Sequence, residues 1–88
     1  MFDTIEIKEV KQELGLLIKS LRKQRGLSQM QLANSLGVSR TTIQNLELGK
    51  NFTADTIFKV LKEMDLLSQL NSEILKAKNH VINSKSMY

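Results

Sequence analysis

A short polar stretch near the middle of the chain carries the side chains best suited to recognition chemistry. Between residues 39 and 48 the sequence places Arg40, Thr41, Gln44 and Asn45, whose side chains make directional hydrogen bonds. Arginine can donate two bonds to guanine, asparagine and glutamine can pair with adenine, and a threonine methyl can touch the thymine methyl. A helix face that is only solvated more often carries Glu and Lys. These four residues are therefore the predicted readers of DNA bases.

A second group of residues is suited to the sugar-phosphate backbone of DNA. Two of them stand at the starts of short helices, where unpaired backbone N–H groups attract phosphate oxygens. The others are one residue within the helix expected at 39–48 and two residues just beyond the end of that helix. The candidate backbone contacts are Gln29, Ser39, Thr42, Lys50 and Asn51.

The positive charge of the chain is concentrated around these candidates. The 88 residues carry a net charge of +4, of which residues 14–50 hold +5, residues 51–88 hold +1 and residues 1–13 hold −2. A concentrated basic segment is what a surface that binds a polyanion requires. Charge alone also fits an ordinary solvated helix face. The interpretation therefore depends on the elements that position these residues.

Other classes of chemistry find little support in the sequence. The absence of cysteine removes disulfides, thiolate metal sites and cysteine nucleophiles, and fits a reducing cytoplasm. The single histidine, His80, has no paired acid nearby, and no glycine-rich phosphate loop or Ser/His/Asp set is present. No apolar run reaches the length of a membrane span, and the N-terminus lacks the features of a signal peptide. We expect a cytoplasmic protein without enzymatic activity, cofactor or metal.

The hydrophobic periodicity predicts an all-α domain. An apolar stripe made of Val10, Leu14, Leu17, Ile18 and Leu21 indicates a first helix over about 10–25. Short helices are expected at 28–36 and 39–48, a fourth from residue 53 to about 64, and a fifth from residue 66 onward. The alternation of Ile5 and Ile7 with charged residues fits either a short strand or a first helical turn.

The second and third of these helices have the spacing of a helix-turn-helix. Ser28 and Gln31 form a capping box at the start of the first one. Two short helices that cross steeply need a small residue at the contact and a left-handed backbone in the turn. The residues that fill this pattern are Gln29, Ala33, Gly37, Ile43 and Leu46. The alternative is a plain helical hairpin within a bundle.

The segment "LRKQRGLSQMQLANSLGVSRTTIQNLELGK" resembles the lambda repressor/Cro-type (XRE) helix-turn-helix family, over about residues 14–67. The resemblance implies a five-helix lambda-repressor-like DNA-binding domain that forms homodimers on palindromic operators. It implies that Gln29 and Ser39 contact phosphates or groove edges, and that Arg40, Thr41 and Asn45 contact bases. It further implies an ion pair between Arg22 and Glu47, the only acid of the basic segment. The alternatives are a phosphate contact for Arg22 and an exposed charge for Glu47.

Two segments of the chain indicate a subgroup within this family. "ELGLLIKSLRKQRGLSQ" and "TADTIFKVLKEMDLL" are most similar to the small regulators that accompany HipA-type toxin kinases. Those regulators are antitoxins that also repress their own operon, so a toxin protein becomes a possible partner. Asp65 stands where many relatives have glycine, which puts the end of the fourth helix in doubt.

The expected organisation is an N-terminal arm at 1–9, a DNA-binding domain at 10–70 with its helix-turn-helix at 28–48, and a C-terminal extension at 71–88. The fifth helix carries a narrow apolar seam whose residues are three and four apart. The seam comprises Leu67, Leu70, Ile74, Ala77 and Val81. It could contact a second copy or another protein, or fold back on its own domain. The final "NSKSMY" is expected to lack structure.

Overall fold

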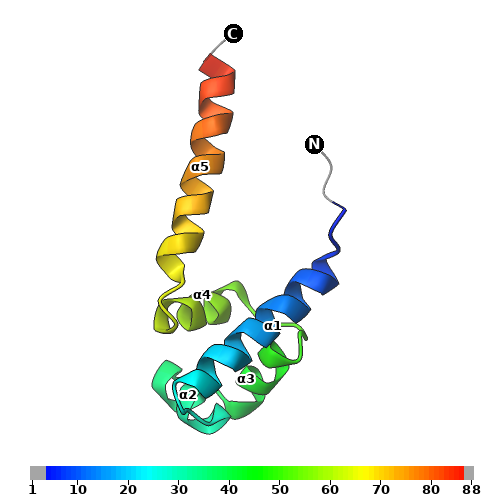
Figure 1. The fold of residues 1–88 in the computed structure, drawn as a ribbon, viewed down its shortest axis with the longest axis vertical. Coiled ribbons are helices and arrows are strands. Elements are labelled where there is room, and N and C mark those ends of the chain that lie inside the picture. Colours follow the sequence, from blue (N-terminus) through cyan, green and yellow to red (C-terminus); the bar gives the residue numbers. More distant parts are fainter. Residues whose placement is uncertain (1–3, 87–88) are drawn as a thin grey trace.

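A computed structural model describes residues 4–86 of the chain, with side chains as far as Ser84. This part of the chain contains five helices and no strand (Figure 1), which confirms the all-α prediction. The helices are α1 (Ile7–Gln24), α2 (Gln29–Leu36), α3 (Arg40–Glu47), α4 (Ala54–Glu63) and α5 (Leu67–Ser86). The first four pack together as the domain, and α5 projects from it.

The core draws its side chains from the first four helices. The largest fully buried side chains are Ile18 of α1, Leu32 of α2, Ile43 and Leu46 of α3, and Val60 of α4. Leu67 and Leu70 at the start of α5 are partly buried against this cluster, whereas residues 71–84 of α5 are exposed. The domain is therefore closed around α1–α4, and α5 is attached through its first turns.

The turn between α2 and α3 has the structure expected from its residues. The Ser28 hydroxyl accepts a hydrogen bond from the Gln31 backbone N–H, and the Gln31 side chain accepts one from the Ser28 N–H. Gly37 ends α2 at φ 69°, a conformation that other residues adopt at a cost. The Val38 N–H then bonds to the Ala33 carbonyl at 3.0 Å, which closes the turn. The crossing of α2 and α3 is thereby set by local chemistry.

The first helix differs from the expectation in two ways. It begins at Ile7 and not near residue 10, so the alternation of Ile5 and Ile7 marks a helix start and no strand. Val10 and Leu17 belong to the apolar stripe that predicted the helix, but they are 53% and 44% exposed and lie outside the core. The N-terminal half of α1 extends past the other helices (Figure 1), so its apolar stripe is covered only at Leu14, Ile18 and Leu21.

The turn between α4 and α5 contains a strained non-glycine residue. Asp65 has φ 60°, the left-handed conformation that a glycine would adopt more readily. The residue is held there by Arg25, whose guanidinium bonds to the Asp65 carboxylate at 3.0 Å and to the Glu63 carbonyl at 2.7 Å. The end of α1 is thus tied to the point where α5 leaves the domain.

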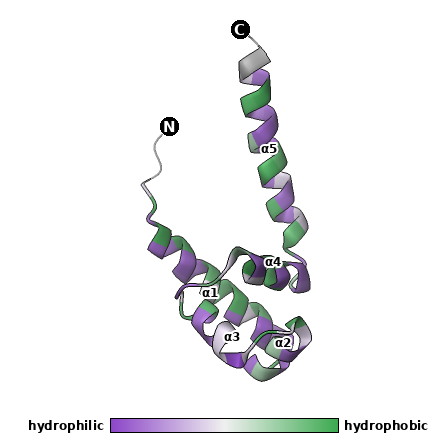
Figure 2. Cartoon of the chain, turned by 180° about the vertical axis from the view of Figure 1, so that it is seen from behind, coloured by the Kyte–Doolittle hydropathy of each residue, from purple (hydrophilic) through white to green (hydrophobic). Residues whose placement is uncertain are grey.

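The C-terminal helix is longer than the sequence suggested. α5 continues through Ser86, so the expectation that "NSKSMY" lacks structure is wrong for residues 83–86, and residues 87–88 lie outside the described part. Straight-chain helix formers and the absence of Pro and Gly in this segment favour continuation of the helix. Figure 2 shows hydrophobic residues recurring along the projecting part of α5.

Candidate nucleic-acid interface

The predicted base-reading residues share the outer side of α3. Ile43 and Leu46 are fully buried and fix the inner side of the helix against the core. With 3.6 residues per turn, Arg40, Thr41 and Gln44 then face outward, and all three are exposed. Asn45 lies at the edge of this surface and is half-buried. The arrangement presents hydrogen-bonding side chains along the outer side of α3.

Ser39 and Thr42 stabilise the start of α3. The Ser39 hydroxyl accepts a bond from the Thr42 backbone N–H at 3.1 Å, and the two hydroxyls lie 2.8 Å apart. A side-chain cap of this kind contributes about 1 kcal/mol to the helix. The two residues stand at the N-terminal end of α3, where the helix dipole is positive. That end of the helix suits an anion such as a phosphate.

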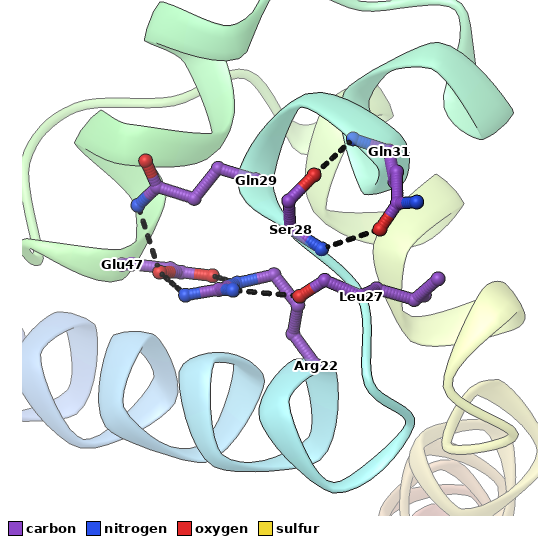
Figure 3. A network of polar contacts seen from close by, with 6 residues as sticks. All are labelled: Arg22, Leu27, Ser28, Gln29, Gln31 and Glu47. Carbon is purple, nitrogen blue, oxygen red and sulfur yellow. Dashed lines mark hydrogen bonds and ion pairs between the residues drawn. The ribbon is translucent and has the colours of Figure 1, made fainter.

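A buried polar network joins α1, α2 and α3 behind this surface (Figure 3). The Arg22 guanidinium donates to the Glu47 carboxylate through Nε at 2.6 Å and through Nη2 at 3.0 Å. Its Nη1 donates to the Leu27 carbonyl at 2.8 Å. The Gln29 amide nitrogen donates to the same Glu47 carboxylate at 3.0 Å. The structure thus brings Arg22 and Glu47 together, and it adds Gln29 to the pair.

The network satisfies charges that would otherwise be costly. The side chains of Arg22 and Glu47 are only 9% and 3% exposed. Glu47 stands at the C-terminal end of α3, where the helix dipole disfavours a carboxylate. Arg22 offsets this charge, and the hydrogen bond to Glu47 raises the pKa of the Arg22 guanidinium, with burial acting against it. Arg22 is therefore a cation near neutral pH.

Arg22 of α1 can contact Glu47 of α3 because the two helices lie very close together at Gly15. At Gly15 an added Cβ would lie 2.6 Å from the carbonyl oxygens of both Leu46 and Glu47. Only glycine permits this approach, since the neighbouring atoms are backbone. Sequence reasoning missed Gly15. The available signal was a glycine inside the apolar stripe of a helix, which usually has a packing reason.

The predicted backbone contacts beyond α3 divide into two kinds. Lys50 is exposed, and its backbone N–H bonds to the Asn45 carbonyl at 2.9 Å, which places it just past the end of α3. The Asn51 side-chain oxygen accepts a bond from the Lys11 ammonium at 3.0 Å. Lys11 also lies 6.0 Å from the centre of the Phe52 ring. Asn51 therefore links the loop after α3 to α1, a role that the sequence did not predict.

The described residues lack the features of a metal site and of a membrane span. Residues 4–86 contain no group of three His, Cys, Asp or Glu side chains that could hold a metal ion. His80 lies exposed on α5. No helix within this range is long and apolar enough to cross a membrane.

Comparisons with known proteins agree with this geometry. The helix-turn-helix family model matches residues 18–68, which span α2, α3 and α4 and parts of α1 and α5. The ImmF control region 10 kDa protein of Bacillus phage phi105 is 36% identical over 64 residues, which cover 73% of this chain and 68% of that protein. Antitoxin HipB of Escherichia coli strain K12 is 36% identical over 55 residues, which cover 61% of this chain and 62% of that protein.

Proposed function

Since the chain belongs to the helix-turn-helix family, as a DNA-binding regulator of the XRE type, we propose that it is a sequence-specific repressor. It binds a palindromic operator as a homodimer, with α3 in the major groove. The observation that carries the proposal is the outer side of α3, where Arg40, Thr41 and Gln44 are exposed above a fully buried inner side. A rigidly seated polar helix of this kind fits the major groove.

In this proposal each residue has a distinct role on DNA. Arg40, Thr41, Gln44 and Asn45 contact base edges, with Arg40 and Thr41 deepest because they stand at the N-terminal end of α3. Residues around them hold the backbone and fix the register of the helix. These are Gln29, Ser39, Thr42, Lys50 and Asn51. The Arg22–Glu47 pair acts from beneath, by holding the Gln29 amide against α3.

The homodimer is proposed from the symmetry that such an operator imposes. Two copies of α3 must enter successive major grooves on one side of the duplex, about 34–36 Å apart. The projecting helix α5 supports the proposal, because Ile74 and Val81 of its seam are exposed while Leu67 and Leu70 pack against the domain. Only the outer part of the seam is thus free for a second copy. Since the operator lies on the genome, we place the protein in the cytoplasm.

Mapping the DNA that the protein protects upstream of its own gene tests this function. The proposal expects two related half-sites about 10–10.5 base pairs apart from centre to centre, or a multiple of that distance. It also expects the affinity to fall steeply as salt rises, because each neutralised phosphate releases counterions. Protection without any repeated half-site, or an affinity that is flat between low and physiological salt, would contradict it.

A second candidate function is that of an antitoxin which binds and restrains a HipA-type toxin kinase and represses its own operon. The 36% identity to Antitoxin HipB favours it, and the exposed apolar residues of α5 offer a surface for a protein partner. The two functions are compatible. Co-expression with the product of the neighbouring gene distinguishes them: relief of that product's toxicity supports the antitoxin, and a gene without a toxic neighbour supports the repressor alone.

A further inference from the structure

The projecting helix α5 carries more exposed apolar surface than one seam requires. Ile74 and Val81 belong to the seam, but Leu75 and Ile82 are also exposed, to 41% and 53%. Each of these follows a seam residue directly, so the second pair lies about 100° around the helix from the first. A helix with two apolar stripes at this angle is suited to two neighbours, as in a helix bundle. A single neighbouring helix would cover one stripe and leave the other exposed to water.

Residues 10–17 of α1 carry an apolar stripe with the same spacing. Val10 and Leu17 are 53% and 44% exposed and stand seven residues apart, as Leu75 and Ile82 do on α5. Two helices with equal residue spacing also have equal spacing in ångströms, so the stripes match over about two turns. The stripes on α1 and α5 are therefore exposed apolar surfaces of equal length.

The charges within the two stripes are complementary. On α1 a glutamate, Glu13, lies three residues after Val10 and four before Leu17. On α5 a lysine, Lys78, takes the same place, three residues after Leu75 and four before Ile82. Both are exposed, and neither takes part in an ion pair within the described part of the chain. Opposite charges at equivalent positions set both the partner and the register of a helix contact.

We infer that the second stripe of α5 in one copy packs on residues 10–17 of α1 in the other copy. Leu75 and Ile82 then cover Val10 and Leu17 of the second copy, and Lys78 faces its Glu13. The inference rests on the proposed homodimer and deepens it. It leaves Ile74 and Val81 for contact between the two α5 helices, so that two α1 and two α5 helices form one four-helix cluster.

A contact within one chain does not satisfy the two stripes. α5 leaves the domain beside α4 and diverges from the N-terminal half of α1, as both views show (Figures 1 and 2). The bonds from Arg25 to Asp65 and to the Glu63 carbonyl hold the turn from which α5 departs. A second copy related by a twofold axis covers both stripes at once, because each copy offers one of each. Such a contact closes on itself as a dimer.

Charge reversal in separate chains tests the inference. In Glu13→Lys two lysines meet at each contact of the homodimer, and in Lys78→Glu two glutamates meet. Each single variant should raise the dimer dissociation constant by about tenfold or more, because symmetry repeats the repulsion. An equal mixture of the two variants restores opposite charges at both contacts. The mixture should therefore form heterodimers about as tightly as the parent forms homodimers, as measured by sedimentation equilibrium.

The matched control is Lys76→Glu, which makes the same charge change on the opposite side of α5. Among the described residues, Lys76 forms an ion pair with Glu73 of its own helix, at 3.3 Å, and the dimer of this variant should match that of the parent. Single reversals that dimerise as the parent does, or a mixture that stays monomeric, would overturn this inference and leave the proposed repressor intact. A parent that is monomeric both free and on operator DNA would overturn the proposed homodimer as well.

Discussion

Replacing Glu47 with alanine removes the acceptor on which three N–H donors converge. Two of the donors belong to Arg22 and one to Gln29, at distances between 2.6 and 3.0 Å. After the substitution the Arg22 guanidinium keeps only its bond to the Leu27 carbonyl. Its side chain is 9% exposed, so water replaces the lost carboxylate poorly. The variant therefore leaves a buried cation without its counter-charge.

The expected loss follows from the burial of the pair. Breaking a buried ion pair by removing one partner costs about 3–5 kcal/mol, whereas an exposed pair contributes little. The unpaired Gln29 amide adds to this loss, although that group is only partly buried. A domain of this size has a free energy of unfolding on the order of 5–15 kcal/mol. The substitution should thus remove a substantial part of the total stability.

Urea denaturation followed by circular dichroism measures the effect. Glu47→Ala should lower the midpoint by at least about 1 M. The double reversal Arg22→Glu with Glu47→Arg should recover part of the loss, because it restores opposite charges. Glu73→Ala, which breaks an exposed pair on α5, serves as the control and should leave the midpoint unchanged. Equal midpoints for Glu47→Ala and the parent would refute the structural role of the pair.

Three further substitutions give separate outcomes. Gly15→Ala should destabilise the domain by about 1–3 kcal/mol, despite the better helix propensity of alanine, because the new Cβ meets two carbonyl oxygens of α3. An unchanged midpoint in urea would mean that α1 and α3 pack less closely than described. Asp65→Gly should raise stability by up to about 1 kcal/mol by relieving the left-handed backbone, and a decrease would show that the bond to Arg25 matters more. Lys50→Ala should weaken binding to operator and scrambled duplex alike and make the salt slope shallower by about one unit. A loss confined to the operator would assign Lys50 to base reading.

Local chemistry made the helix-turn-helix predictable. The capping box at Ser28 and the left-handed Gly37 each act within a few residues, and both are confirmed. The first helix was predicted less well, because periodicity identifies an apolar stripe but not the length of stripe that neighbours cover. Val10 and Leu17 belong to the stripe and yet are exposed.

The candidate site was predictable in its residue types and less so in its supporting contacts. The exposure of Arg40, Thr41 and Gln44 followed from the periodicity of α3. Two supporting contacts depend on residues far apart in the chain. The bond from Gln29 to Glu47 spans 18 residues, and the approach of Gly15 to the end of α3 depends on the crossing of two helices. A glycine within the apolar stripe of α1 indicates a close approach but not its partner, and no local pattern indicates the bond between Gln29 and Glu47.

The most direct test of the account is a titration of Arg40→Ala against its mapped operator and a scrambled duplex of equal length. Arg40 is exposed on α3 and its side chain takes no part in the core, so the variant should fold as the parent does. We expect a loss of about 1–3 kcal/mol on the operator and far less on the scrambled duplex. If Arg40→Ala binds both duplexes as the parent does, α3 is not the reading helix and the proposed repressor mechanism is wrong.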